Sequence, residues 1–131
     1  MAIWHGESGK KPTGGVIHLA RKKRKYELGR FPIYPRIGEE KSVNISTKGG
    51  QLKTKLKSIS FVNVLDIKNK ITKKVKILDV ITNPANPDLA RRKIITRGAI
   101  VNTELGKAKV TSRPSQHGVA NAILVTEKEG K

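Results

Sequence analysis

The clearest structural signal in the chain lies at residues 59–80, which read ISFVNVLDIKNKITKKVKILDV. Within this stretch, residues 59–66 and 73–80 largely alternate apolar and polar side chains, which is the pattern of a β-strand with one buried face. The Lys68-Asn69-Lys70 segment between them interrupts the alternation and predicts a turn. These residues therefore predict two neighbouring antiparallel strands.

A second pair of strands is predicted on the N-terminal side of this stretch, from about residue 41. Val43 and Ile45 alternate with polar neighbours, and residues 52–56 do so again after a Gly49-Gly50 break. Two consecutive glycines permit the positive φ angles of a tight hairpin turn. The pattern is typical of a β-hairpin.

Four more short strands are predicted after an interruption at residues 83–87, where two prolines cannot continue a ladder. They lie at residues 93–96, 99–104, 107–113 and 118–126, and are separated by segments 97–98, 105–106 and 114–117. Closely spaced strands without a helical stripe favour an all-β fold. We expect a small closed barrel of about six to seven short antiparallel strands, since closure hides the strand edges. The barrel domain would span residues 41–131.

The composition points to a polyanionic partner. The 131 residues include 28 Lys plus Arg against 10 Asp plus Glu, for a formal net charge of +18. A net charge of this size indicates what the protein binds rather than how it folds, and nucleic acid is the first candidate partner. An anionic membrane is the second, but neither a basic amphipathic helix nor a lipidation signal is found, so no membrane partner is expected. The absence of cysteine excludes disulfides and thiolate metal sites, and without a signal-peptide pattern we expect an intracellular, cytoplasmic protein.

Residues 1–40 are expected to form an irregular basic extension. A helix is conceivable only at residues 16–28, which contain no Gly or Pro, yet the five adjacent cations Arg21–Lys25 oppose it. Four of the five aromatic residues also lie in this segment: Trp4, Tyr26, Phe31 and Tyr34. Cations bind phosphates and rings stack on unpaired bases, so the combination indicates an RNA-binding extension that becomes ordered on its partner. The alternative is a solvated charge run beside ordinary packing aromatics.

A second basic block occupies residues 91–116, with seven basic side chains and one acidic. If Lys107, Lys109 and Arg113 point outward while Ala108 and Val110 point inward, the cations would form a basic strip on the barrel. The alternative is a solvated outer face, but surfaces kept only for solubility usually mix both signs of charge.

Sites for catalysis or metal binding are not expected. His5, His18 and His117 lack ligand partners at metal-binding spacing, and the adjacent Glu39 and Glu40 would point to opposite sides of a strand. A phosphate-binding loop around Gly9-Lys10 fails, because Trp4 and Lys11 stand where the motif requires Gly and Ser or Thr. We expect no cofactor, no metal, no catalytic residue and no small-molecule substrate.

Several motifs, in order, resemble one known family. They are Trp4-His5-Gly6, residues 10–15, residues 20–30, residues 83–87 and residues 103–114. Together they resemble the archaeal and eukaryotic small-subunit ribosomal protein family number eight (e-type), from Trp4 to about Val125. Glu7 and Val16 depart from the resemblance, since basic residues would be expected there.

The resemblance implies a non-enzymatic component of the small ribosomal subunit, with the extension threaded into ribosomal RNA and the barrel docked on its surface. The implied partners are small-subunit ribosomal RNA and neighbouring ribosomal proteins, without homo-oligomerisation. Eukaryotic members are longer, so this short chain resembles the archaeal form. Three rival functions stay in view: a free RNA-binding protein or RNA chaperone, an architectural DNA-binding small barrel, and an RNA-processing enzyme. An RNA-processing enzyme would need a group of acids or a metal site that the spacing does not provide.

The residues expected to contact RNA fall in the two basic regions. In the extension they are Trp4, His5, Lys10, Lys11, Thr13, Gly14, Gly15, Arg21, Lys22, Lys23, Arg24, Lys25, Tyr26, Arg30 and Arg36, and in the second block Arg91, Arg92, Arg97, Lys107, Lys109 and Arg113. Glycines of the Pro12–Gly15 turn would let the backbone approach a sugar-phosphate chain closely.

Overall fold

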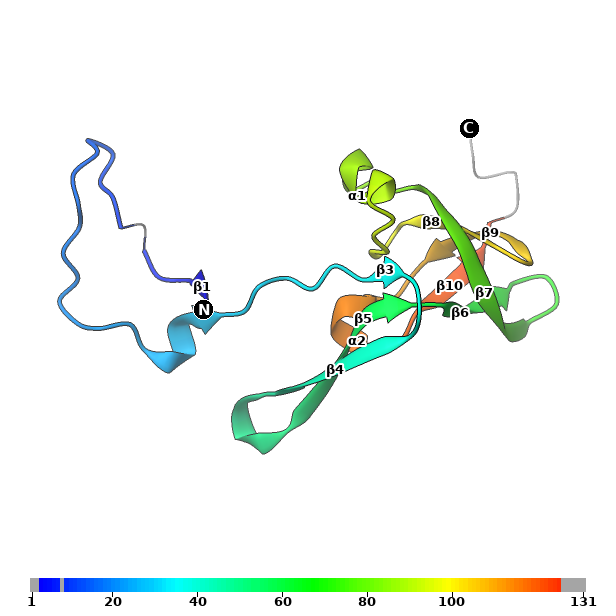
Figure 1. The fold of residues 1–131 in the computed structure, drawn as a ribbon, viewed down its shortest axis with the longest axis horizontal. Helices are drawn as coiled ribbons and strands as arrows, with labels where there is room; N and C mark the ends of the chain where they lie inside the picture. The colour runs from blue at the N-terminus through cyan, green and yellow to red at the C-terminus, as the bar shows by residue number, and fades with distance from the viewer. Residues whose placement is uncertain (1–2, 8, 126–131) are drawn as a thin grey trace. The chain divides into compact units, whose positions relative to one another are not determined.

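In a computed structural model, which describes residues 3–7 and 9–125, five strands close into a barrel (Figure 1). In spatial order they are β10 (Asn121–Leu124), β6 (Phe61–Asp66), β7 (Ile71–Thr82), β8 (Ile100–Thr103) and β9 (Gly106–Val110). The barrel belongs to a unit of residues 33–131, the barrel unit, and residues 1–32 form a separate arm unit. The predicted all-β barrel is confirmed.

The expectation that all strands are antiparallel and number six to seven is wrong in both details. The barrel has five strands, and β10 pairs with β6 in parallel, with Asn121 beside Asn63 and Ala122 beside Val64. The other four neighbouring pairs are antiparallel. An odd number of strands that alternate in direction cannot close without one parallel pair, so the strand count itself dictates this exception.

The barrel interior is filled by small and β-branched side chains from alternating strand positions. Val62 and Val64 of β6 and Val101 of β8 are at most 1% exposed, and Ala108 of β9 is completely buried. The described core also contains Leu56, Ile59, Val75, Ile77, Val80, Ile95, Val110, Ala120 and Ala122. A core without aromatic rings follows from the 4% aromatic content of the chain.

Beside the barrel, the predicted hairpin is present in a three-stranded sheet. It is formed by β4 (Lys41–Ser46) and β5 (Leu52–Ile59), with the two-residue β3 (Arg36–Ile37) pairing in parallel on the other side of β5. The turn is a short 3₁₀ segment, η2 (Lys48–Gly50), in which Gly49 has φ 80° and Gly50 has φ 78°. These angles are in the left-handed region, which confirms the predicted role of the two glycines.

The predicted strand at residues 93–96 is wrong. The interruption at residues 83–87 leads into a short helix, α1 (Pro87–Arg91), capped by the Asn86 side chain, which accepts a 2.9 Å hydrogen bond from the Asp88 N–H. Ile94 then makes only an isolated bridge to Arg36, and Ile95 is fully buried without joining a ladder. The apolar pattern at these positions reports burial rather than strand pairing.

The last two predicted strands are confirmed with shorter bounds, as β9 and β10. Between them lies a four-residue helix, α2 (Pro114–His117), where a turn was expected. Gly118 follows α2 with φ 71°. Thr126, the predicted end of the last strand, lies outside the described residues.

In the arm unit, a two-residue ladder joins β1 (Ile3–Trp4) to β2 (Leu28–Gly29), with Trp4 paired to Leu28. A 3₁₀ turn, η1 (Lys25–Glu27), precedes β2. Residues 16–24 are in neither helix nor strand, apart from a single bridge at Val16, so the predicted irregular conformation of this stretch is confirmed.

Candidate nucleic-acid interface

Glu27 is the organising side chain of the arm unit. Its carboxylate accepts a 3.0 Å hydrogen bond from the Trp4 indole Nε1–H and a 3.1 Å bond from the Arg24 backbone N–H, and it forms an ion pair with Arg21. A backbone hydrogen bond links the same two segments, because the His5 N–H donates to the Glu27 carbonyl oxygen at 2.9 Å. One acidic residue thus joins the start of the arm to its basic run.

The surrounding donors hold Glu27 in its charged form. The Arg21 guanidinium, then the Trp4 indole and the Arg24 N–H, lower the pKa of Glu27 to about 2. In return, the hydrogen bond to Glu27 raises the pKa of Arg21. Both groups are therefore charged across the whole physiological pH range.

The aromatic rings of the arm unit contact its own cations. The Lys23 ammonium lies 5.3 Å from the Trp4 ring centroid, and the Arg21 guanidinium lies 5.9 Å from that of Tyr26. Both distances fall within the range of cation–π attraction. The ring of Trp4 also covers Gly6, where an added Cβ would lie 2.0 Å from Trp4 Cζ2. The structure thus brings together four predicted RNA-binding residues: Trp4, Arg21, Lys23 and Tyr26.

A tight turn contains five other predicted residues of the arm unit, Lys10, Lys11, Thr13, Gly14 and Gly15. The Gly14 N–H donates to the Lys11 carbonyl oxygen at 2.9 Å, and the Lys11 N–H donates to the Gly15 carbonyl oxygen at 2.8 Å. Gly14 has φ 87°, which a residue with a side chain rarely adopts. A bridge between Lys10 and Val16 closes the loop. The turn predicted at Pro12–Gly15 is confirmed.

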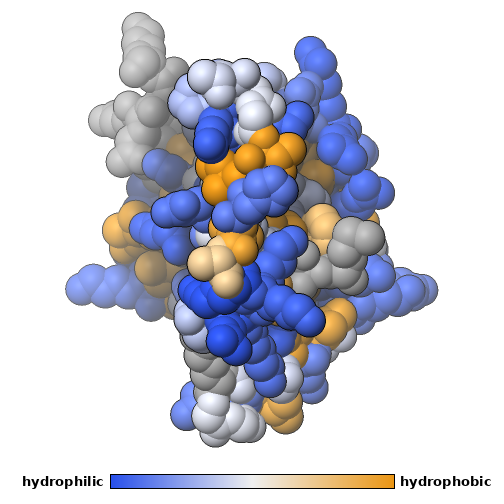
Figure 2. All heavy atoms as spheres, turned by 90° about the vertical axis from the view of Figure 1, so that its left-hand side faces the viewer, coloured by the Kyte–Doolittle hydropathy of each residue, from blue (hydrophilic) through white to orange (hydrophobic). Residues whose placement is uncertain are grey.

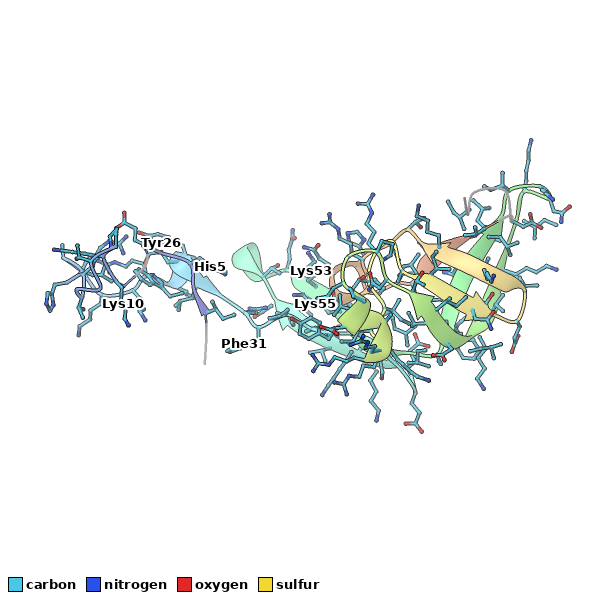
Figure 3. All side chains as sticks on the ribbon, turned by 90° about the horizontal axis from the view of Figure 1, so that it is seen from above. His5, Lys10, Tyr26, Phe31, Lys53 and Lys55 are labelled. Atoms are coloured by element: carbon cyan, nitrogen blue, oxygen red, sulfur yellow. The ribbon has the colours of Figure 1, made fainter. Side chains whose placement is uncertain are left out.

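Every predicted RNA-binding residue is exposed except Trp4, which is half-buried. Figure 2 shows hydrophilic side chains over most of the face in view, with apolar ones between them. Figure 3 labels three predicted residues of the arm unit, His5, Lys10 and Tyr26. This exposure is compatible with binding to a large anionic surface.

On the barrel unit, the predicted alternation of β9 is confirmed. Lys107 and Lys109 are exposed, while Ala108 and Val110 are buried. Arg113 is exposed but lies beyond the end of β9, at the N-terminus of α2, so it is not part of the same strand.

The remaining predicted cations of the barrel unit lie on three other elements. Arg91 ends α1 and pairs with Asp88 at 3.3 Å, Arg92 follows it, Arg97 is in the turn before β8, and Arg36 is in β3. The structure brings Lys107 and Lys109 to one strand face and leaves the others on separate elements.

The role of Glu27 was not predicted from the sequence. A usable signal existed, because Glu27 is the single acidic residue between Glu7 and Glu39, in a stretch with nine cations. Lys53 and Lys55 on β5, which Figure 3 labels, were not among the predicted residues, and they alternate with Thr54 and the buried Leu56. Alternation within a predicted hairpin was the available signal there.

Groups of potential metal ligands and membrane-spanning helices are absent from residues 3–7 and 9–125. In this part of the chain, no group of three or more His, Cys, Asp or Glu side chains could hold a metal ion. None of the helices described there combines the length and the apolar character needed to cross a membrane.

Comparison with known proteins gives a consistent result along nearly the whole chain. Residues 4–125 match the family described as ribosomal protein S8e. Three archaeal proteins named small ribosomal subunit protein eS8 are similar to the chain. That of Hyperthermus butylicus is 46% identical over 130 residues, covering 98% of this chain and 96% of the relative. The protein of Methanococcus vannielii is 48% identical over 128 residues, covering 97% of this chain and 100% of the relative. The protein of Nanoarchaeum equitans is 48% identical over 122 residues, covering 93% of this chain and 96% of the relative.

Proposed function

The chain belongs to the ribosomal protein S8e family, and from this we propose that it is a structural component of the small ribosomal subunit that binds and stabilises ribosomal RNA. The strongest support for this proposal is the similarity, over nearly the whole chain, to relatives named small ribosomal subunit protein eS8. The family is not enzymatic, so the protein acts by binding. Its place is the ribosome of the cytoplasm, in contact with small-subunit RNA and neighbouring ribosomal proteins, and we expect it not to form homo-oligomers.

The proposed mechanism is neutralisation of phosphate where RNA segments approach each other. Lys22, Arg24 and Lys25 are exposed cations within five residues, on a backbone held by the Glu27 network. Such a cluster binds several phosphates and releases their counterions, which favours one compact RNA arrangement. The charge of +18 would otherwise repel itself in a compact protein.

The barrel unit supplies the second part of the proposal. Its closed sheet has a rigid core, and Lys107 and Lys109 stand on the outer face of one of its strands. Phosphate contacts from a rigid element fix register and orientation without reading sequence. We therefore propose that the barrel docks on the RNA surface while residues 1–40 penetrate between RNA segments.

Sucrose-gradient sedimentation of the native protein, with its bound RNA identified by sequencing, tests the proposed function. We expect the protein in small-subunit fractions, with small-subunit ribosomal RNA as the recovered species. Sedimentation apart from ribosomes with many RNAs would indicate a free RNA-binding protein, and recovery with the chromosome would indicate an architectural DNA-binding protein. Either result would overturn the assignment.

A further inference from the structure

Phe61 is the single aromatic residue among residues 41–131, and it is on the outside of the barrel. Its neighbours Val62 and Val64 point into the core at 1% exposure, whereas Phe61 is 43% exposed. A phenylalanine ring is one of the largest apolar groups a core can gain, and this core is built entirely from smaller side chains. Its outward position therefore calls for an explanation other than core packing.

Two lysines of the neighbouring strand flank the ring. In the register of β6 and β7, Lys76 is opposite Phe61 and Lys74 is opposite Asn63. The Lys74 ammonium lies 5.1 Å from the centroid of the Phe61 ring, and both lysines are exposed. Positive charge is thus present directly beside an accessible ring.

A pair of amide side chains lies beside these residues, one on β6 and the other on the neighbouring strand β10. Asn63 is the register partner of Asn121 on β10, and the Asn63 side-chain N–H donates a 3.1 Å hydrogen bond to the Asn121 amide oxygen. This bond uses one donor and one acceptor of the pair, so each amide keeps a further group that can bind a ligand. Asn side chains form paired hydrogen bonds with base edges.

We propose that Phe61, Asn63, Lys74, Lys76 and Asn121, the Phe61 patch, form a binding site for an unpaired nucleotide of RNA. The inference rests on the proposed function as an RNA-binding protein. An unpaired base stacks on the Phe61 ring, the adjoining phosphates pair with Lys74 and Lys76, and the amides contact the base edge. Aromatic stacking beside cations is the usual means of holding single-stranded RNA on a sheet surface. A duplex hides its base faces and cannot use the ring.

The experiment is an NMR titration of the isotope-labelled full chain with a single-stranded oligouridylate hexamer, and in parallel with an RNA duplex of equal charge. We expect the hexamer, and not the duplex, to shift the Phe61 ring signals and the side-chain amide signals of Asn63 and Asn121. Phe61→Leu keeps a large apolar side chain but removes the ring. It should weaken hexamer binding at the patch by about five-fold or more, which is the lower end of the contribution of one stacked base.

Two further variants keep the result interpretable. Leu105→Ala truncates an apolar side chain of nearly equal exposure, 44%, in the β8–β9 turn, and should leave hexamer binding unchanged. Lys74→Gln removes an exposed charge without touching the core. It should weaken binding and lower the salt slope by about 0.7, as expected for one phosphate contact to a single strand.

The proposal would be overturned if the hexamer left the signals of the patch unmoved, or if the duplex shifted them equally. It would also be overturned if Phe61→Leu and Leu105→Ala weakened hexamer binding equally. The ring and its lysine neighbours would then serve only as a cross-strand pair that stabilises the sheet. Such a result leaves the ribosomal assignment intact if the native protein still sediments with the small subunit, so the two failures are distinguishable.

Discussion

The indole N–H of Trp4 donates a 3.0 Å hydrogen bond to the carboxylate of Glu27, 23 residues further along the chain. The same carboxylate binds the backbone of Arg24 and the side chain of Arg21. The arm unit has little apolar core of its own, so one acidic side chain holds its basic run in a defined place. Preorganised cations lose less conformational entropy when they bind, so we expect Glu27 to favour RNA binding although its charge opposes phosphate.

The Glu27 network predicts an acid transition confined to the arm unit. The folded pKa of about 2 is below the usual glutamate value near 4.3, so the network is complete above about pH 4.3 and is lost as the pH falls through about 2. Trp4 is the only tryptophan, so its fluorescence reports the change directly. We expect a fluorescence transition near pH 2 that is absent in Glu27→Gln. A transition at pH 4 or above would contradict the network.

Gly6→Ala should displace the Trp4 ring. The added Cβ would lie 2.0 Å from Trp4 Cζ2, which no packing adjustment of a few tenths of an ångström can relieve. We expect a red-shifted Trp4 emission spectrum, because the indole becomes more exposed to water. Gly9→Ala is the matched control, since an added Cβ there meets no atom within 4 Å. Identical spectra for Gly6→Ala and the unaltered protein would show that the Trp4 ring does not occupy this position in solution.

Arg24→Glu or Lys25→Glu should weaken binding to small-subunit ribosomal RNA and leave the melting temperature of the barrel nearly unchanged. Both side chains are exposed, and both belong to the arm unit. The measurements are RNA affinity at several salt concentrations and thermal unfolding. A slope of roughly 0.7 per contacted phosphate of a single strand is expected for the unaltered protein, with a smaller slope for each variant.

Lys68→Glu makes the same change in net charge in the β6–β7 turn, outside both basic blocks. It should weaken RNA binding less than the substitutions at Arg24 and Lys25. Equal weakening would show that total charge, rather than the position of the basic run, controls affinity. A large drop in the melting temperature of Arg24→Glu would show that the run is part of the fold.

Gly118→Ala should destabilise the barrel unit more than Gly98→Ala. Both glycines have φ in the left-handed region, at 71° and 85°, so both substitutions carry a backbone cost of about 1–2 kcal/mol. At Gly118 the new Cβ would also lie 3.0 Å from the Thr54 carbonyl oxygen on β5, whereas at Gly98 it meets open space. Urea unfolding measures the difference. Equal losses would show that the backbone of β5 moves away at little cost.

The parts of the fold that were predictable depend on neighbouring residues. The hairpin of β4 and β5 follows from alternation on either side of Gly49 and Gly50, and a tight turn leaves the strands few other ways to pair. The parallel pairing of β10 with β6 was not predictable, because it joins Asn121 to Asn63 across 58 residues. Alternation shows that a strand has one buried face and contains no information about which strand lies beside it.

The same limit explains the error at residues 93–96. Ile94 and Ile95 are buried, as apolar β-branched residues should be, but their backbone N–H groups donate to the Leu89 and Pro35 carbonyl oxygens at 2.9 Å rather than to a strand. Lys93 has φ 54°, which breaks the extended conformation just before them. The burial of these residues could be predicted from the sequence, but their hydrogen-bond partners could not.

Net charge was sufficient to indicate a polyanionic partner, because it is a sum over residues that holds for any arrangement of the chain. The all-β fold was predictable from the alternation of apolar and polar residues and from the turn residues between the strands. The Glu27 network and the closing parallel pair became visible only in the folded chain. Each depends on groups that are distant in sequence and meet only after folding. Their contacts are set by the packing of the whole unit, which no local pattern of residues encodes.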